Sequence, residues 1–112
     1  MIEKTILDYI KNKIDVPVYM EVPKTPPKRF IVIEKTGGSG ENFIYTSTFA
    51  VQSYAESKYQ AAALNDKVKG IMLDEEADIP DVSAVDYGGD YDYTDNTTKQ
   101  YRYQLVLIIT HY

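Results

Sequence analysis

The chain has 112 residues, a formal net charge of -5 and no cysteine. This length fits one domain, residues 1–112, which buries roughly two-thirds of its unfolded surface. The absence of cysteine excludes a disulfide framework and thiolate chemistry. The acidic balance argues against a protein that grips nucleic acid by neutralising phosphates, which requires a concentrated Lys/Arg surface. Without a signal-peptide pattern or an apolar run of about 20 residues, we expect a soluble protein made in the cytoplasm.

The first quarter of the chain predicts one helix and two strands. Residues Ile2–Lys13 place apolar side chains at helical spacing and predict a short helix. Val18–Val22 is typical of a short strand, and Pro23–Pro27 is a stiff connector because prolines fix φ and remove backbone donors. Arg29–Lys35 is apolar on both faces in its middle and predicts a strand inside the sheet.

A glycine-rich segment follows, Thr36–Asn42, with the sequence TGGSGEN. It is too long and too rich in glycine for a two-residue hairpin turn, so we predict a loop. It lacks the Lys-Ser/Thr pair of a phosphate-binding loop, and a strand follows it instead of a helix. Two interpretations remain open, an ordinary flexible loop and a loop that orders against a partner. The candidate partner-contact residues are Gly37, Gly38, Ser39, Gly40 and Glu41.

The stretch Thr46–Leu73 organises the rest of the chain, because a strand runs directly into the only long, well-capped helix. Thr46–Tyr54 is rich in Thr, Phe, Val and Tyr and predicts a half-buried strand. Ser57 and Gln60 have the spacing of a capping box, which predicts the helix start. Beyond it one apolar stripe should face a sheet. Its members are Ala61, Leu64, Val68, Ile71 and Met72, whereas Asn65 is among the polar residues expected mostly outside it.

The last third predicts two more strands. Asp74–Asp78 holds four carboxylates, which favour a solvated loop over a metal site because no histidine or second cluster supplies a geometry. Val82–Tyr93 predicts a strand with a bulge or bend at Gly88-Gly89. Thr94–Gln100 is a polar hairpin connection, and Tyr101–His111, apolar on both faces, predicts a central strand. The predicted fold is α+β, a mostly antiparallel sheet of about five strands with two helices packed on one face, in the order α-β-β-β-α-β-β.

No residue pattern indicates catalysis. His111 is the only histidine, so neither a Ser-His-Asp arrangement nor a multi-histidine metal site can be assembled from the sequence. Asp90–Asn96 resembles the start of a calcium loop but lacks its glycine, and Tyr101 stands where the bidentate Glu belongs, which leaves only weak surface cation binding open. We therefore predict no enzyme, no catalytic, cofactor-binding or metal site, and no cofactor. A hydrolase that relies on carboxylates is an alternative that would require an acid with a strongly raised pKa.

The tyrosine content is unusual, because the chain has 11 tyrosines and no tryptophan. Tyrosines on a sheet provide large apolar area with a polar tip, which suits a protein contact. The alternative is that they form cross-strand pairs whose sole role is to stabilise a hairpin. An RNA-binding sheet is a further alternative, but acidic residues surround these tyrosines where it needs basic ones. Alternation along a strand predicts that Tyr91 and Tyr93 share a face, as do Tyr101 and Tyr103. The candidate interface residues on the last two strands are Tyr87, Tyr91, Tyr93, Tyr101 and Tyr103.

The layout resembles the small tail-terminator, or tail-completion, proteins of long-tailed bacteriophages. Four features carry the resemblance: the N-terminal helix, the order of proline, strand and Thr-Gly-Gly in Val16–Gly38, the run Phe49–Val68, and the final strand YRYQLVLIIT. The likeness covers nearly the whole chain, and related head–tail connectors and minor tail proteins share much of it.

This resemblance implies a structural virion protein at the head-proximal end of the tail, assembled in the host cytoplasm. Members of the family form a ring, commonly of six, that ends tail polymerisation and offers a surface to the head. The implied partners are further copies of the chain, the tail tube protein and a head-completion protein, with no membrane. Thr36–Asn42 would face the lumen or the tube, and the late hairpin a neighbouring subunit. DNA would pass without being specifically bound, which an acidic lumen permits.

Overall fold

The computed structural model describes residues 1–112 as one five-stranded sheet with two helices. The predicted α+β class and element order are confirmed. The elements are α1 (Ile2–Lys11), β1 (Val18–Tyr19), β2 (Phe30–Glu41), β3 (Ile44–Ala55), α2 (Lys58–Met72), β4 (Val82–Asp92) and β5 (Tyr101–His111).

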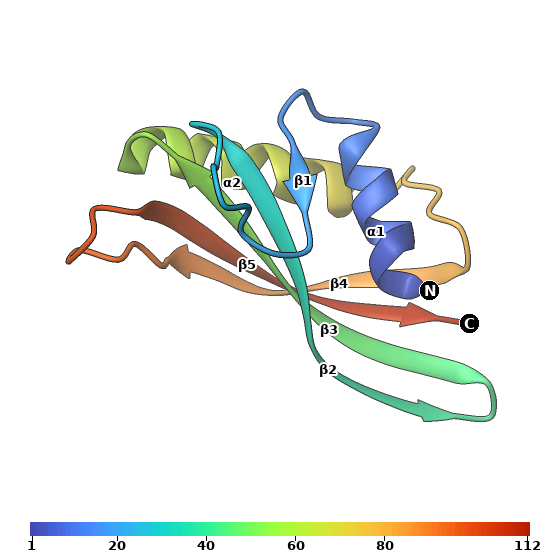
Figure 1. Cartoon of the computed structure of the whole chain (residues 1–112). Helices are drawn as coiled ribbons and strands as arrows, with labels where there is room; N and C mark the ends of the chain where they lie inside the picture. Colours follow the sequence, from blue (N-terminus) through green and yellow to red (C-terminus); the bar gives the residue numbers. More distant parts are fainter.

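The strands lie in the order β1-β2-β3-β5-β4 (Figure 1). β1 runs parallel to β2, and the other neighbours are antiparallel. β5 has the predicted bounds and, as predicted, is central, since it pairs with β3 on one side and β4 on the other. The β2–β3 hairpin extends away from the body, and the molecule measures 44 × 25 × 25 Å.

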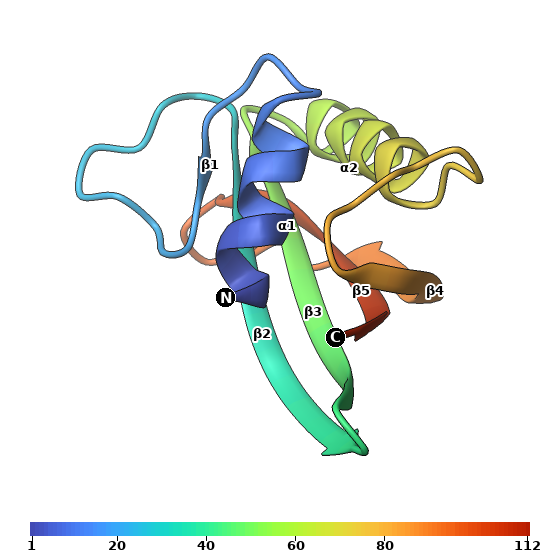
Figure 2. The same cartoon turned by 90° about the vertical axis from the view of Figure 1, so that its right-hand side faces the viewer.

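Both helices cover the same face of the sheet, as predicted (Figure 2). Their apolar stripes bury side chains from alternate positions of β2, β3 and β5, because successive strand residues point to opposite faces. We call this side the helix face and the other side the open face. The buried core of the helix face is Ile6, Ile10, Val18, Ile31, Ile33, Phe49, Val51, Leu64, Val68, Met72, Ile79, Leu105, Leu107 and Ile109.

Helix α2 begins where its sequence predicts. Ser57 is the N-cap, and its hydroxyl accepts a hydrogen bond of 3.1 Å from the Gln60 backbone N–H. The predicted stripe is confirmed in part: Ala61, Leu64, Val68 and Met72 are buried, whereas Ile71 is only half-buried. Asn65, placed by sequence among residues outside the stripe, is 1% exposed because its amide bonds to strand β4.

The loop predicted for Thr36–Asn42 is wrong. β2 continues to Glu41, paired with β3 throughout apart from a bulge between Lys35 and Gly37, where the predicted strand ended. The hairpin closes through a two-residue turn at Asn42 and Phe43, with φ of 53° and 66°, the signs of a type I′ turn. Pairing with the threonine-rich start of β3 therefore overrides the weak strand preference of the glycines.

The first two elements are shorter than predicted. α1 ends at Lys11 instead of Lys13, and β1 comprises Val18–Tyr19 instead of Val18–Val22. β1 pairs only with Ile31 and Val32, so the outer edge of β2 beyond these residues has no partner strand. The molecule thus leaves a long edge of backbone donors and acceptors open to other chains.

Candidate assembly surfaces

A bulge in β4 divides the predicted interface tyrosines between the two faces of the sheet. Tyr87 pairs with Leu107 and lies on the helix face. The predicted bulge at Gly88-Gly89 then adds one residue, so Tyr91 pairs with Gln104 and lies on the open face. Tyr93 lies beside Tyr91, with ring centroids 5.9 Å apart. The tyrosines of β4 therefore do not share one surface.

The two tyrosines of β5 lie on the helix face as well. Tyr101 pairs with Ala55 and Tyr103 with Ser53, in the same alternating set as the buried Leu105. Both are half-buried. As predicted, Tyr91 shares a face with Tyr93, and Tyr101 shares a face with Tyr103. The two pairs lie on opposite faces of the sheet, and the open-face pair, Tyr91 and Tyr93, is 47% and 42% exposed.

Six side chains of the open face form a closed network across β3, β5 and β4. We call it the platform: Gln52, Tyr54, Tyr91, Tyr93, Arg102 and Gln104.

Hydrogen bonds connect four of the six platform side chains. The Tyr54 hydroxyl donates to Gln52 Oε1 at 3.3 Å, and Gln52 Nε2 donates to Gln104 Oε1 at 2.9 Å. Gln104 Nε2 donates to the Tyr91 hydroxyl at 2.5 Å. These side chains come from neighbouring strands in register, so sheet pairing fixes their order.

Arg102 closes the network. Its guanidinium carbon lies 4.5 Å from the Tyr93 ring centroid and 5.8 Å from that of Tyr54. Its Nε donates to the Tyr93 backbone carbonyl at 2.7 Å, and Nη1 to Gln100 Oε1 at 3.2 Å. No carboxylate forms an ion pair with Arg102. The arginine is therefore held rigidly by aromatic rings while its charge remains available to an incoming group.

Aromatic stacking continues from the platform to the other edge of the sheet. The Phe30 and Tyr54 rings stack with centroids 4.4 Å apart, and Tyr19 packs edge-on against Phe30 at 6.1 Å. Next to this row along the two strands, Arg29 Nε donates to both carboxylate oxygens of Glu56 at 3.0 Å, and the hydrogen bonds from Arg29 lower the pKa of the Glu56 carboxyl to about 2. The platform thus adjoins the buried aromatic side chains Phe30 and Tyr54, and it does not lie on a mobile loop.

The arrangement suits a protein contact better than base stacking. Phe30 already stacks against the Tyr54 ring, and Arg102 covers Tyr93. Nucleic-acid bases need free aromatic faces and nearby cations, whereas the Asp95 carboxylate lies close enough to Arg102 for the two charges to interact. Tyr and Arg held in fixed positions are typical of the energetic centres of protein interfaces.

Opposite the platform, the bulge creates a polar contact with helix α2. Asp90 lies on the helix face, where Asn65 Nδ2 and Lys69 Nζ donate to its Oδ2 at 2.7 and 2.9 Å, and Tyr87 donates to Oδ1. These bonds, that from Tyr87 above all, lower the pKa of the Asp90 carboxyl. The cluster connects strand β4 to the helix and is interpreted as structural.

The single histidine has a buried partner that the sequence did not reveal. Ser47 Oγ and His111 Nε2 lie 2.7 Å apart, and the Tyr45 ring stacks on the imidazole at 5.8 Å. Nδ1 lies 3.3 Å from the Tyr112 carbonyl and meets no carboxylate. Ser47 is 1% exposed, so a substrate could not reach its hydroxyl in this conformation. The pair satisfies two buried polar groups.

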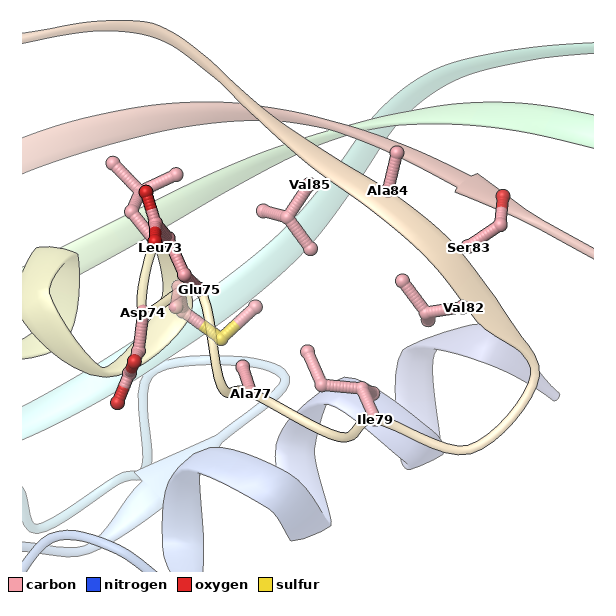
Figure 3. A pocket seen from close by; sticks show the side chains of 10 residues that line it. Leu73, Asp74, Glu75, Ala77, Ile79, Val82, Ser83, Ala84 and Val85 are labelled. Carbon is pink, nitrogen blue, oxygen red and sulfur yellow. The ribbon is translucent and has the colours of Figure 1, made fainter.

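A cavity of about 300 Å³ lies between the end of α2, the acidic turn and β4 (Figure 3). Ile79, Val82 and Val85 point into it, whereas the Asp74 carboxylate points away. The Asp74–Asp78 segment is non-helical, as predicted, and Asp74 Oδ1 accepts from the Glu76 N–H at 2.9 Å. No group of three or more His, Cys, Asp or Glu side chains gathers here or elsewhere in a metal-binding arrangement. The cavity lacks the converging polar groups of a ligand site.

The glycine-rich part of β2 is exposed on both faces and along its outer edge. Tyr45 crosses over Gly40, where an added Cβ would lie 2.4 Å from the ring, so a larger residue at this position would force the Tyr45 side chain to move. At Gly37 an added Cβ would meet nothing within 4 Å. Gly37 directly follows the bulge in β2, and a strand glycine often marks such a bulge.

Sequence reasoning missed the most exposed large apolar side chain, Phe43 at the hairpin tip, which is 86% exposed. An aromatic residue next to Asn42, at the end of a glycine-rich segment, was the available signal. Neither helix is long and apolar enough to span a bilayer. No protein-family model matches the chain, and a search of curated proteins finds no significant match.

Proposed function

We propose that this protein is a structural virion component of a long-tailed bacteriophage, a ring subunit that caps the tail tube, ends its polymerisation and joins the tail to the head. The observation that carries the proposal is the platform: an uncovered sheet face with Tyr91, Tyr93 and Arg102 fixed in place before any partner binds. Preorganised side chains of these types lose little entropy on association.

Two further features support assembly. The outer edge of β2 from Glu34 to Glu41 has no partner strand, and such edges accept a strand from another chain. The net charge of -5 is compatible with a lumen through which DNA slides without being held. We assign the platform to a subunit interface and the glycine-rich strand to a partner in the ring or the tube. A related head–tail connector or minor tail protein would use the same surfaces.

The first test is light scattering of the purified protein over a wide concentration range, with electron microscopy of any large species. We expect closed rings, and antibody labelling of phage particles at the head-proximal end of the tail. Particles that carry no label at that end would overturn the proposal. If the free protein stays monomeric, the proposed ring can form only on the tail itself. Labelling of phage particles then decides whether it does.

A further inference from the structure

We infer that the tip of the β2–β3 hairpin, with Phe43 at its end, inserts into the groove between α1 and β1 of a second copy of this chain. The inference rests on the proposed ring assembly and specifies one of its contacts.

The tip holds an aromatic residue where the backbone favours glycine. A type I′ turn prefers Asn-Gly, and Asn42 fits the first position, but Phe43 occupies the second with φ of 66°. A bulky residue at positive φ is a conformational outlier. Phe43 is also 86% exposed, so its ring buries little surface inside its own chain. Strain combined with an exposed aromatic ring is typical of a binding position.

The groove offers an apolar surface without an occupant. It has a volume of about 580 Å³ and lies where the chain leaves β1 beside helix α1. Met20 and Val22 in its wall are 42% and 44% exposed. A methionine side chain adapts its shape to an incoming ring. The apolar residues lining the groove are Leu7, Val18, Tyr19, Met20, Val22 and Pro23.

The β2–β3 turn and strand β1, whose residues line the groove, lie at opposite ends of β2 (Figure 1). β1 pairs with Ile31 and Val32, and the turn follows Glu41, which is roughly 33 Å further along at about 3.3 Å per residue. Phe43 therefore cannot reach the groove of its own chain. Each copy presents one tip and one groove, so the contact is heterologous and generates a ring where the rotation closes.

One new ion pair is available to this docking. Glu41 immediately precedes the turn, and the groove lining carries one basic side chain, Lys24, and one acidic side chain, Glu21; none of the three forms an ion pair within the chain. The docking that we infer places Glu41 beside Lys24 and away from Glu21. The unpaired edge of β2 begins beside the groove, where an incoming strand finds free backbone groups. A hairpin tip covers less than the roughly 1,600 Å² of a standard interface, so free copies should associate weakly.

The test uses one tip variant, Phe43→Ser, one groove variant, Val22→Glu, and the control Tyr59→Ser, which changes a side chain that is 78% exposed on α2. Association is followed by sedimentation velocity up to millimolar protein, with melting curves to verify folding. We expect the wild type and the control to associate and each interface variant to lose at least tenfold in affinity. An equimolar mixture of the two variants should form a one-to-one dimer, because one keeps a groove and the other a tip.

A disulfide trap provides a second readout, since the chain has no cysteine of its own. Glu41→Cys mixed with Lys24→Cys should give a crosslinked heterodimer under mild oxidation. Tyr59→Cys mixed with Lys24→Cys serves as the control and should give only background crosslinking.

The outcomes separate this inference from the proposed function. Association that both interface variants leave intact, a mixture that stays monomeric, or a wild type monomeric at millimolar concentration would each overturn the tip-groove contact, while labelling of phage tails could still succeed. Tip-dependent rings that never label a phage tail would instead overturn the proposed function and leave the contact standing.

Discussion

The two faces of the sheet differ in what covers them and in which side chains they carry. The helix face buries a cluster of 14 hydrophobic residues under α1 and α2. The open face has a buried cluster of only three, Phe30, Val32 and Tyr54, which continues into the partly exposed platform. The difference indicates that one face supplies most of the folding free energy, while the other holds a prearranged polar and aromatic surface for contact. Substitutions on each face should therefore affect different measurements.

The largest effect is expected on the helix face, at Val68 of α2, which is 0% exposed. Val68→Asp would leave an unpaired carboxylate in the core, and we expect a loss of more than about 4 kcal/mol, enough to unfold the domain. Circular dichroism and urea titration check this. Ala63→Asp, exposed on the same helix, is the matched control and should fold. A Val68→Asp variant that melts normally would contradict the helix-sheet packing.

The second largest loss of stability is expected at Gly88, in the bulge of β4. A Cβ added at Gly88 would lie 2.9 Å from Ile108 Cδ1 and 3.0 Å from Val106 Cγ1. We expect Gly88→Ala to cost about 1–3 kcal/mol through overpacking. Gly37→Ala, where the added group meets open space, should change the free energy of unfolding by less than about 0.5 kcal/mol. Equal stability of the two variants in urea would show that the bulge is not tightly packed.

A pH titration examines the contact between β4 and α2. Hydrogen bonds from Tyr87, Lys69 and Asn65 lower the pKa of Asp90 in the folded state. The stabilisation is therefore present above the unfolded pKa of about 3.9 and is lost as the pH falls through the folded pKa. We expect Asp90→Asn to lower stability by about 1–2 kcal/mol at neutral pH and to flatten the decline on acidification.

Asp86→Asn is the control for this titration. Asp86 is exposed on the same strand, pairs with Ile108 and makes no hydrogen bond through its side chain. Its replacement should leave both the stability at neutral pH and the acid decline close to the wild-type values. An Asp90→Asn variant with an unchanged acid profile would show that the cluster does not connect strand and helix in solution.

The smallest change in stability, and a large change in association, is expected at the platform. Replacing Tyr91 and Tyr93 together with Ala removes exposed rings, so we expect about 1 kcal/mol of destabilisation but at least a tenfold loss of self-association. Light scattering measures the second quantity. Tyr59→Ala, on the exposed side of α2, should leave association unchanged. Unaltered association of the double variant would remove the platform from the subunit interface.

Elements with strong local signals could be predicted from the sequence alone. The Ser57 hydroxyl accepts from the Gln60 N–H as the capping pattern predicts, and the apolar residues after it give the buried stripe of α2. The β5 strand, Tyr101–His111, has the predicted bounds because its apolar run fits only a strand paired on both sides. The Gly88-Gly89 bulge was likewise predicted, since glycines interrupt a strand locally.

Other features depend on pairing partners that are distant in the sequence. Thr36–Asn42 has the composition of a loop, but β3 lies beside it and supplies the hydrogen bonds that make it strand up to Glu41. Asn65 is polar and was placed outside the core, yet Asp90 accepts a hydrogen bond from its Nδ2 across the helix-sheet boundary. Neither partner can be identified from local propensity, because the contacts form only when the sheet closes.

The tyrosines show most clearly what could not be predicted from the sequence alone. Their number and position on the last two strands were determined by the sequence, together with the glycines between Tyr87 and Tyr91. Only the tertiary structure decided which face each one occupies, because a bulge shifts the alternation by one residue and the shift is defined relative to β5. Arg102 likewise joins Tyr54 and Tyr93 through strand register. The sequence by itself thus determined the elements and the side chains available for contact, and the pairing of distant strands decided which of them form one surface.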